Sequence, residues 1–112
     1  MDIESLTIKE AREIASLFQA TPSSSQNPYR IGKNYFIRTV THHFTGRLVE
    51  VHAQELVLED VAWIADDGRF SDAVSAGTFS EVEPCPEGRV ILGRGSVIDA
   101  HEISFPLPRR QK

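Results

Sequence analysis

The sequence Gly93-Arg94-Gly95 is a stretch whose residue types could bind an anion. A phosphate-binding P-loop needs a longer glycine loop that ends in Lys-Ser or Lys-Thr and opens a helix, and a dinucleotide fingerprint needs a third glycine. A serine and two β-branched residues follow here instead, so the sequence predicts a tight turn that joins two strands. The guanidinium of Arg94 suits phosphate or carboxylate. The alternative for Arg94 is a structural ion pair with Asp60 or Glu59.

Histidines and carboxylates are the next candidates, because they supply acid–base chemistry and metal ligands. No HExxH or similar spaced pair occurs, so surface or hairpin positions are predicted for the histidines rather than a metal site. Asp66-Asp67-Gly68 is typical of a turn. A small hydrolase that uses His42, His43 and the Asp66 region is kept as an alternative. The four histidines are His42, His43, His52 and His101.

The aromatic residues and the single cysteine add no catalytic signature. Trp63 and Phe70 could stack a nucleic-acid base, but Trp63 lies in an apolar strand pattern that predicts a core position. Cys85 is the only cysteine, which excludes an internal disulfide and a cysteine zinc cluster. It stands between two prolines, without a cationic neighbour to activate the thiol. The sequence therefore predicts no catalytic residue, no metal ligand and no cofactor.

The bulk properties limit the class of protein. A length of 112 residues fits one domain. The net charge of −4 argues against duplex DNA as a partner, because DNA affinity rests largely on phosphate neutralisation. The longest apolar runs are far shorter than the roughly 20 residues of a membrane span, and residues 1–20 lack the pattern of a signal peptide. With one cysteine, these features predict a cytoplasmic protein.

A helix, a linker and then strands are expected along the chain. Thr7 and Glu10 form a capping-box pattern at the start of an amphipathic helix, which we place within residues 1–20. A linker rich in serine and proline covers residues 21–32. Residues 33–105 carry five main strand patterns at close spacing, which predicts a strongly bent antiparallel small barrel.

Within that barrel the segment 65–87 is expected to be an insertion. Residues 69–76 form a candidate helical turn that ends at Gly77, and residues 78–83 form a candidate short strand. Gly46 lies inside a strand pattern, where glycine often permits a bend. Residues 106–112 form a basic tail.

This order of elements resembles the Sm and Sm-like superfamily, which includes the bacterial Hfq proteins. The stretch FTGRLVEV…LVLEDVAWI is similar to the first Sm motif, and VILGRGSVID is similar to the second. The first match is carried by Gly46, Leu48, Val51, Leu56, Leu58 and Asp60. The second is carried by Arg94, Gly95 and Val97.

The resemblance implies a homo-oligomeric ring, in which the fourth strand of one subunit pairs with the fifth strand of the next. Those strands would be 88–92 and 96–103. The resemblance also implies an RNA contact at Arg94. The hairpin HAQE departs from the family pattern, because Gln54 or Glu55 stands where RNA-binding members have an asparagine, and the carboxylate of Glu55 would repel phosphate.

Together these observations predict a non-enzymatic, homo-oligomeric binding module. Its ligand would be single-stranded RNA or a nucleotide-like anion, bound at the ring pore or the subunit seam. The alternative is a structural or accessory factor, of phage or mobile-element type, that binds protein and no nucleic acid. The predicted ligand-binding residues are Arg94, Gly95, His52, Gln54 and Glu55.

Overall fold

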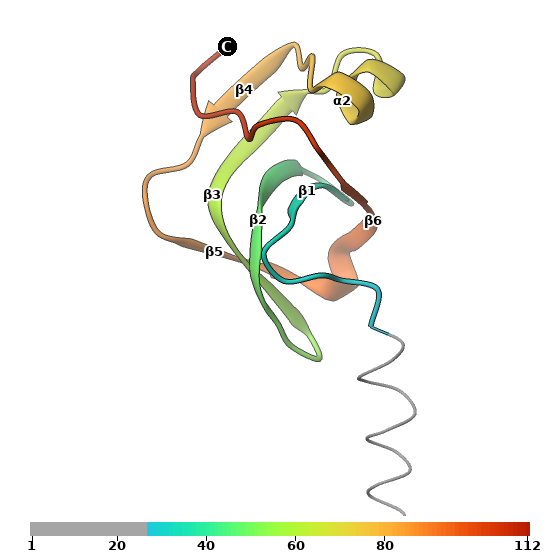
Figure 1. Ribbon diagram of the computed structural model, residues 1–112, viewed down its shortest axis with the longest axis vertical. Helices are drawn as coiled ribbons and strands as arrows, with labels where there is room; N and C mark the ends of the chain where they lie inside the picture. Colours follow the sequence, from blue (N-terminus) through green and yellow to red (C-terminus); the bar gives the residue numbers. More distant parts are fainter. Residues whose placement is uncertain (1–26) are drawn as a thin grey trace, which may run out of the picture.

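Six antiparallel strands in one sheet dominate the computed structural model, which describes residues 27–112 (Figure 1). The helix expected within residues 1–20, and residues 21–26 of the expected linker, lie outside the described residues. The strands are β1 (Asn34–Thr39), β2 (His43–Val51), β3 (Glu55–Asp66), β4 (Glu81–Pro84), β5 (Arg89–Gly93) and β6 (Val97–Glu102). The described part of the chain also contains one α-helix, α2 (Phe70–Ala76), and one 3-10 turn, η2 (Arg94–Ser96).

Strand β3 organises the sheet, because it pairs with three other strands. β2 runs antiparallel along it, β5 pairs with its first half, and β4 pairs with its second half. Between the two halves Asp60 has a positive φ of 53°, and the register against β2 shifts on either side of Arg47 and Leu48. Such irregularities bend a strand and increase its twist, so β3 carries the sheet around a bend.

The predicted five-stranded barrel is wrong. The six strands form one open sheet in the order β4-β3-β2-β1-β6, with β5 also on β3, and β5 does not pair with β6. The cause lies in the segment 65–87, which contributes α2 and then β4. Because β4 occupies the second half of β3, β5 pairs only with the first half, and the two ends of the sheet stay unjoined.

The first of two hydrophobic cores joins side chains from β1, β2, β3 and β5. β2 and β3 approach closely at Gly46, where a Cβ would lie 3.0 Å from Val61 Cγ2 and 3.1 Å from Leu58 Cδ2. Glycine is therefore required there by packing, and the register shift that follows Thr45 agrees with the predicted bend. The buried members of this core are Tyr35, Ile37, Leu48, Leu56, Leu58, Val61 and Leu92.

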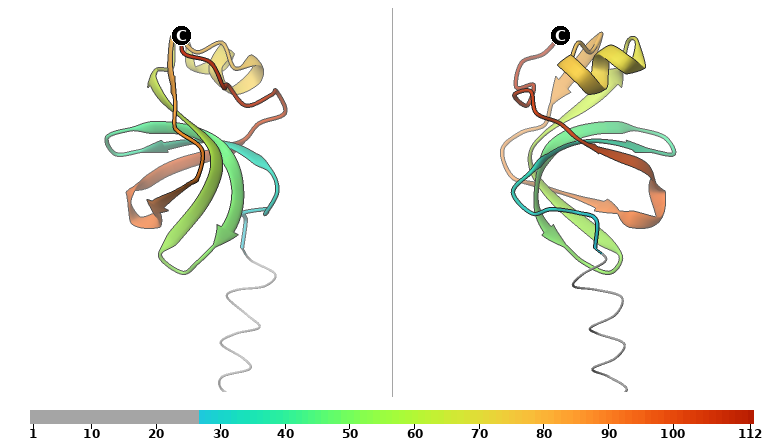
Figure 2. Two further views of the ribbon diagram at one scale, coloured as in Figure 1. Left: turned by 90° about the vertical axis from the view of Figure 1, so that its left-hand side faces the viewer. Right: turned by 45° about the vertical axis from the view of Figure 1, so that its right-hand side comes forward.

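The second core lies on the other side of the sheet, because successive residues of a strand point to opposite faces. Helix α2 covers it and ends at Gly77, which adopts the left-handed conformation with φ of 70°. Residues 105–112 run over the same end of the molecule, opposite the β2–β3 hairpin (Figure 2). The buried members are Phe36, Ala62, Ile64, Ala73, Phe79, Val82 and Ile103. Among residues 27–112, no helix has the length and apolar character that a membrane crossing needs.

Candidate functional site

The structure brings most of the predicted ligand-binding residues together where η2 meets the β2–β3 hairpin. The backbone N–H of Arg94 donates to the carbonyl oxygen of Gln54 at 2.8 Å, and Arg94 Nη1 donates to the carbonyl oxygen of His52 at 2.7 Å. Glu55 lies opposite Gly93 in the β3–β5 pairing. Gly95 follows in η2, with open space where a Cβ would stand. The predicted turn between the last two strands is thus confirmed as a 3-10 turn.

The guanidinium of Arg94 has structural contacts and no carboxylate partner within residues 27–112. It lies 5.2 Å from the ring centroid of Tyr29, as in a cation–π contact. The alternative ion pair with Asp60 or Glu59 is not formed, because Arg47 contacts both carboxylates. The distances are 2.5 Å from Arg47 Nη1 to Asp60 and 3.8 Å from Nη2 to Glu59. Arg94 therefore ties the turn to the hairpin.

An open hollow of about 410 Å³ lies beside this hairpin and has carboxylates in its lining. Glu50 contacts His52 Nε2 at 2.9 Å and also accepts a hydrogen bond from Arg89. The hydrogen bond to His52 and the charge of Arg89 lower the pKa of Glu50, so the group is ionised near neutral pH. The lining residues are Glu50, His52, Glu55, Val57, Arg89 and Ile91. Two carboxylates against one arginine give a phosphate little attraction here.

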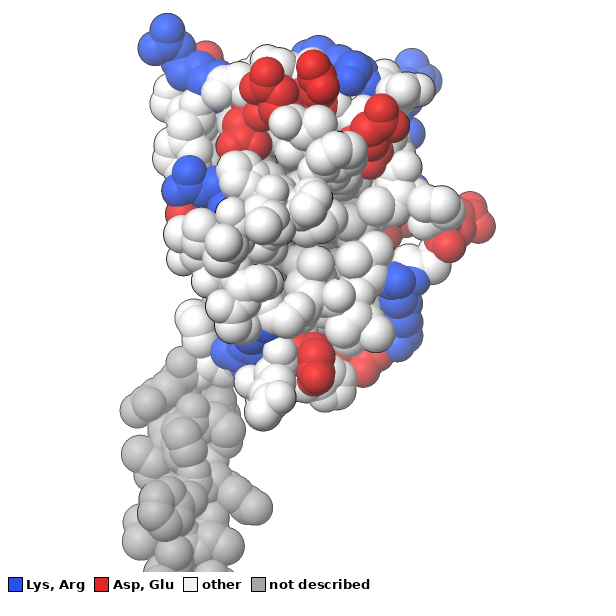
Figure 3. Space-filling model, turned by 180° about the vertical axis from the view of Figure 1, so that it is seen from behind, with Lys and Arg blue, Asp and Glu red and all other residues white. Residues whose placement is uncertain are grey.

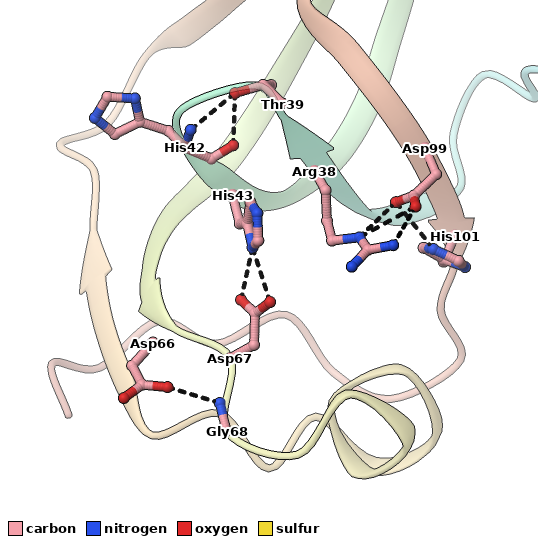
Figure 4. A network of polar contacts seen from close by, with 9 residues as sticks. All are labelled: Arg38, Thr39, His42, His43, Asp66, Asp67, Gly68, Asp99 and His101. Carbon is pink, nitrogen blue, oxygen red and sulfur yellow. Dashed lines mark hydrogen bonds and ion pairs between the residues drawn. The ribbon is translucent and has the colours of Figure 1, made fainter.

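A second polar group joins β1, β2 and β6 to the loop before α2 (Figure 4). Arg38 Nε donates to Asp99 Oδ1 at 2.8 Å, and Arg38 Nη2 donates to the other oxygen of the same carboxylate. His43 Nδ1 lies 2.8 Å from Asp67 Oδ2. The guanidinium of Arg38 also lies 4.5 Å from the ring centroid of Phe70, at the start of α2. We call Arg38, His43, Asp67, Asp99 and His101 the polar network.

Electrostatics in the polar network favour the charged forms of its central pair. The hydrogen bonds from Arg38 hold the pKa of Asp99 below its ordinary value, although partial burial opposes this shift. The same contact raises the pKa of Arg38. His101 Nε2 lies 3.1 Å from Asp99 Oδ1, but this nitrogen is buried and lacks a hydrogen bond within the described residues. The polar network thus connects β1, β2 and β6 to the loop that precedes α2.

The candidate residues of a hydrolase are only partly brought together. His43 meets Asp67, while His42 points away from them (Figure 4). The His42 ring lies 5.7 Å from that of Trp63. Asp66 accepts a hydrogen bond from the backbone N–H of Gly68, as predicted for a turn. No group of three metal-ligating side chains occurs in the part of the chain that the structure describes.

The sequence did not predict the polar network, and the signal for it was weak. Alternation along β1 places Arg38 on the same face as Phe36, which identifies a charged residue at the border of a core. Its partner Asp99 lies 61 residues away, and only the β1–β6 register brings the two side chains opposite each other.

Four apolar side chains on or beside the sheet are exposed. Trp63 is 39% exposed, so its predicted core position is wrong. Ile91 on β5 and Ile98 on β6 are 67% and 64% exposed, and Val40 is 72% exposed in the β1–β2 turn. β5 passes behind β2 and β3 in Figure 1. The face seen from behind has few charged side chains over its middle, and most of its Lys, Arg, Asp and Glu side chains stand around the rim (Figure 3).

The outer edges of β5 and β6 have no strand partner among residues 27–112, because β5 pairs only with β3 and β6 only with β1. Such edges present unpaired N–H and C=O groups, which can pair with another chain. The fold therefore leaves two strand edges available, joined by the short turn η2.

A scan against protein-family models, a search of curated proteins and a search of solved structures found no match to this chain. The resemblance to the Sm-like superfamily accordingly stays a prediction.

Proposed function

We propose that this protein is a non-enzymatic structural module that assembles into homo-oligomers through the outer edges of β5 and β6. The observation that carries the proposal is the pair of outer edges that have no strand partner among residues 27–112, each with an exposed isoleucine, Ile91 and Ile98. Pairing between copies would satisfy the free backbone groups and cover part of both side chains.

Head-to-tail pairing of β5 with β6 of the next copy is the arrangement that uses both edges of every subunit. The charges do not decide the arrangement, because the ionic side chains of both strands already have partners within the subunit, in the pairs Arg89–Glu50, Arg38–Asp99 and Arg30–Glu102.

A protein partner suits this module better than single-stranded nucleic acid. Arg94 already contacts His52 and Tyr29, and the hollow beside it includes Glu50 and Glu55. Binding of RNA or a nucleotide-like anion at Arg94, and a cytoplasmic location, both stay predictions. RNA binding is one of the outcomes that the experiment below distinguishes.

The proposal is tested by the mass of the purified full chain in light scattering, measured over a range of concentrations. We expect a mass several times that of the monomer, and a monomer for Ile91→Lys, because a lysine on an edge strand opposes pairing. Ile31→Lys is the matched control, since Ile31 is 64% exposed but lies outside β5 and β6. A monomer at every concentration contradicts the proposal. Association that appears only when an RNA oligonucleotide is added would favour the nucleic-acid prediction instead.

A further inference from the structure

We propose that the outer edge of β4 is a peptide-binding site that this chain's own segment 105–112 occupies. An extended peptide from another chain can replace the segment if it carries a leucine followed by arginines. The site differs from the edges of β5 and β6, so the proposal does not depend on self-assembly.

The backbone contact is that of an added strand. Val82 N–H donates to the carbonyl oxygen of Lys112, and Lys112 N–H donates to the carbonyl oxygen of Val82, both at 3.0 Å. Two residues that exchange both backbone hydrogen bonds form a hydrogen-bonded pair of an antiparallel ladder. Peptides that extend a sheet edge use the same backbone bonds and gain specificity from side-chain pockets.

The apolar part of the segment fits the second core. Phe105 and Leu107 pack against that core, and the rings of Phe105 and Phe79 lie 6.0 Å apart. A Cβ at Gly77 would lie 2.5 Å from Phe105 Cε2, so the ring needs the bare glycine backbone beside it. A hollow of about 500 Å³ remains next to the segment, with Phe79, Val82 and Leu107 in its lining.

The polar part of the segment is complementary to β4 in charge. Exposed β4 residues Glu81 and Glu83 stand beside a segment that contains three cations, Arg109, Arg110 and Lys112. Gln111 donates from Nε2 to Glu83 Oε1 at 3.1 Å. Opposite charges of this kind favour a basic peptide over an acidic one.

Arg109 adds a contact that recognises backbone rather than charge. Its Nη1 donates to the carbonyl oxygen of Val61 at 2.9 Å, and its Nη2 lies 3.4 Å from that of Cys85. These carbonyls belong to β3 and to the loop after β4. An arginine two positions after the leucine is therefore part of the expected peptide motif.

Residues 109–112 are exchangeable because hydrogen bonds at the surface, and no buried side chain, hold them to the sheet. Residues 109–112 are exposed, and one backbone pair joins them to the sheet. A tethered segment has an effective concentration in the millimolar range, so it competes with any free peptide. Weakening the tethered copy should raise the affinity for a peptide in solution.

The test is the binding of a fluorescent peptide of residues 104–112 to the full chain, followed by anisotropy. The double variant Leu107→Asp/Arg109→Asp should bind the peptide at least about tenfold more tightly than the native chain does. Arg109→Ala, which removes the contacts with the carbonyl oxygens of Val61 and Cys85, should give a smaller gain in the same direction. Lys33→Asp, at an exposed position before β1, is the control that should leave binding unchanged.

Two further binding measurements distinguish specific binding at the β4 edge from nonspecific binding of the peptide. Adding Glu81→Lys and Glu83→Lys to the double variant should weaken peptide binding, and a peptide with both arginines changed to glutamate should not bind. Equal affinity for the native chain and for both tail variants overturns the proposal, as does equal binding of the two peptides.

Discussion

The contact between Arg38 and Asp99 illustrates what single residues contribute to this fold. The pair joins β1 to β6, and the two side chains are 31% and 29% exposed. Arg38 lowers the pKa of Asp99 in the folded state relative to the ordinary value of 3.8. A carboxylate of this kind stabilises the folded protein at pH values above its unfolded pKa, and that stability is lost as pH falls through the folded value.

Asp99→Asn should therefore lower the free energy of unfolding at pH 7 by about 1 kcal/mol, since the pair is only partly buried. The difference between native and variant should shrink as the pH falls below about 4. Urea denaturation at pH 7 and pH 3 measures both. An equal difference at the two pH values would show that the carboxylate charge is irrelevant.

Gly46→Ala should destabilise the protein by about 1–3 kcal/mol, because the added methyl group meets Val61 and Leu58 at contact distances that force repacking. Gly95→Ala is the matched control. A Cβ at Gly95 meets nothing within 4 Å, so its midpoint in urea should stay close to that of the native chain. Comparable losses for the two variants would contradict the packing role of Gly46.

Single residues were predictable where local chemistry decides their structure. The turn at Gly93-Arg94-Gly95 and the bend at Gly46 were predicted from local sequence and agree with the structure. The turn does not use the left-handed freedom of glycine, because Gly93 has a φ of −71°. Trp63 was assigned wrongly to the core. Its neighbours Ala62 and Ile64 point into the second core, so the Trp63 side chain lies on the opposite face of β3, where it is 39% exposed. The polar network was missed because its members meet only after three strands have taken their register.

At the scale of elements, hydrophobic alternation located the strands well. The strand patterns FTGRLVEV (44–51), LVLEDVAWI (56–64) and 88–92 correspond to β2, β3 and β5, with ends that differ by two residues or fewer. The helical turn expected at 69–76 is α2. The partner of each strand was not predictable in the same way, because β4 and β5 compete for one neighbour, β3.

The loop before α2 is held by the contact between His43 and Asp67. His43→Ala should therefore increase the hydrogen-exchange rates of the α2 amides several-fold, since local opening of this element loses one of its ties. His42→Ala is the neighbouring control, because His42 points away from Asp67 (Figure 4). Unchanged exchange in both variants would mean that the second core alone holds α2.

At the scale of the whole molecule, the open sheet is the feature that local patterns could not predict. Closure of a barrel depends on whether the first and last edges meet, and here the segment 65–87 supplies α2 and β4 in between. In the described part of the chain, the outer edges of β5 and β6 thus have no strand partner, and pairing with another copy can use them.

Mixing two edge variants tests how copies join. Ile91→Lys retains an intact β6 edge, and Ile98→Lys retains an intact β5 edge. Head-to-tail pairing predicts that each variant alone is a monomer and that an equimolar mixture forms a dimer that grows no further. Light scattering measures the masses. A mixture that stays monomeric, or an Ile98→Lys variant that dimerises alone through β5, would contradict the head-to-tail arrangement.

The most direct test of edge pairing is hydrogen exchange of the backbone amides in β5 and β6 as a function of protein concentration. Pairing between copies predicts that amides on the outer edges become protected as concentration rises, and that Ile91→Lys abolishes this protection. The amides that bond β5 to β3 and β6 to β1 serve as internal references. Edge pairing is contradicted if the outer-edge amides exchange rapidly at every concentration in a sample that light scattering shows to be oligomeric.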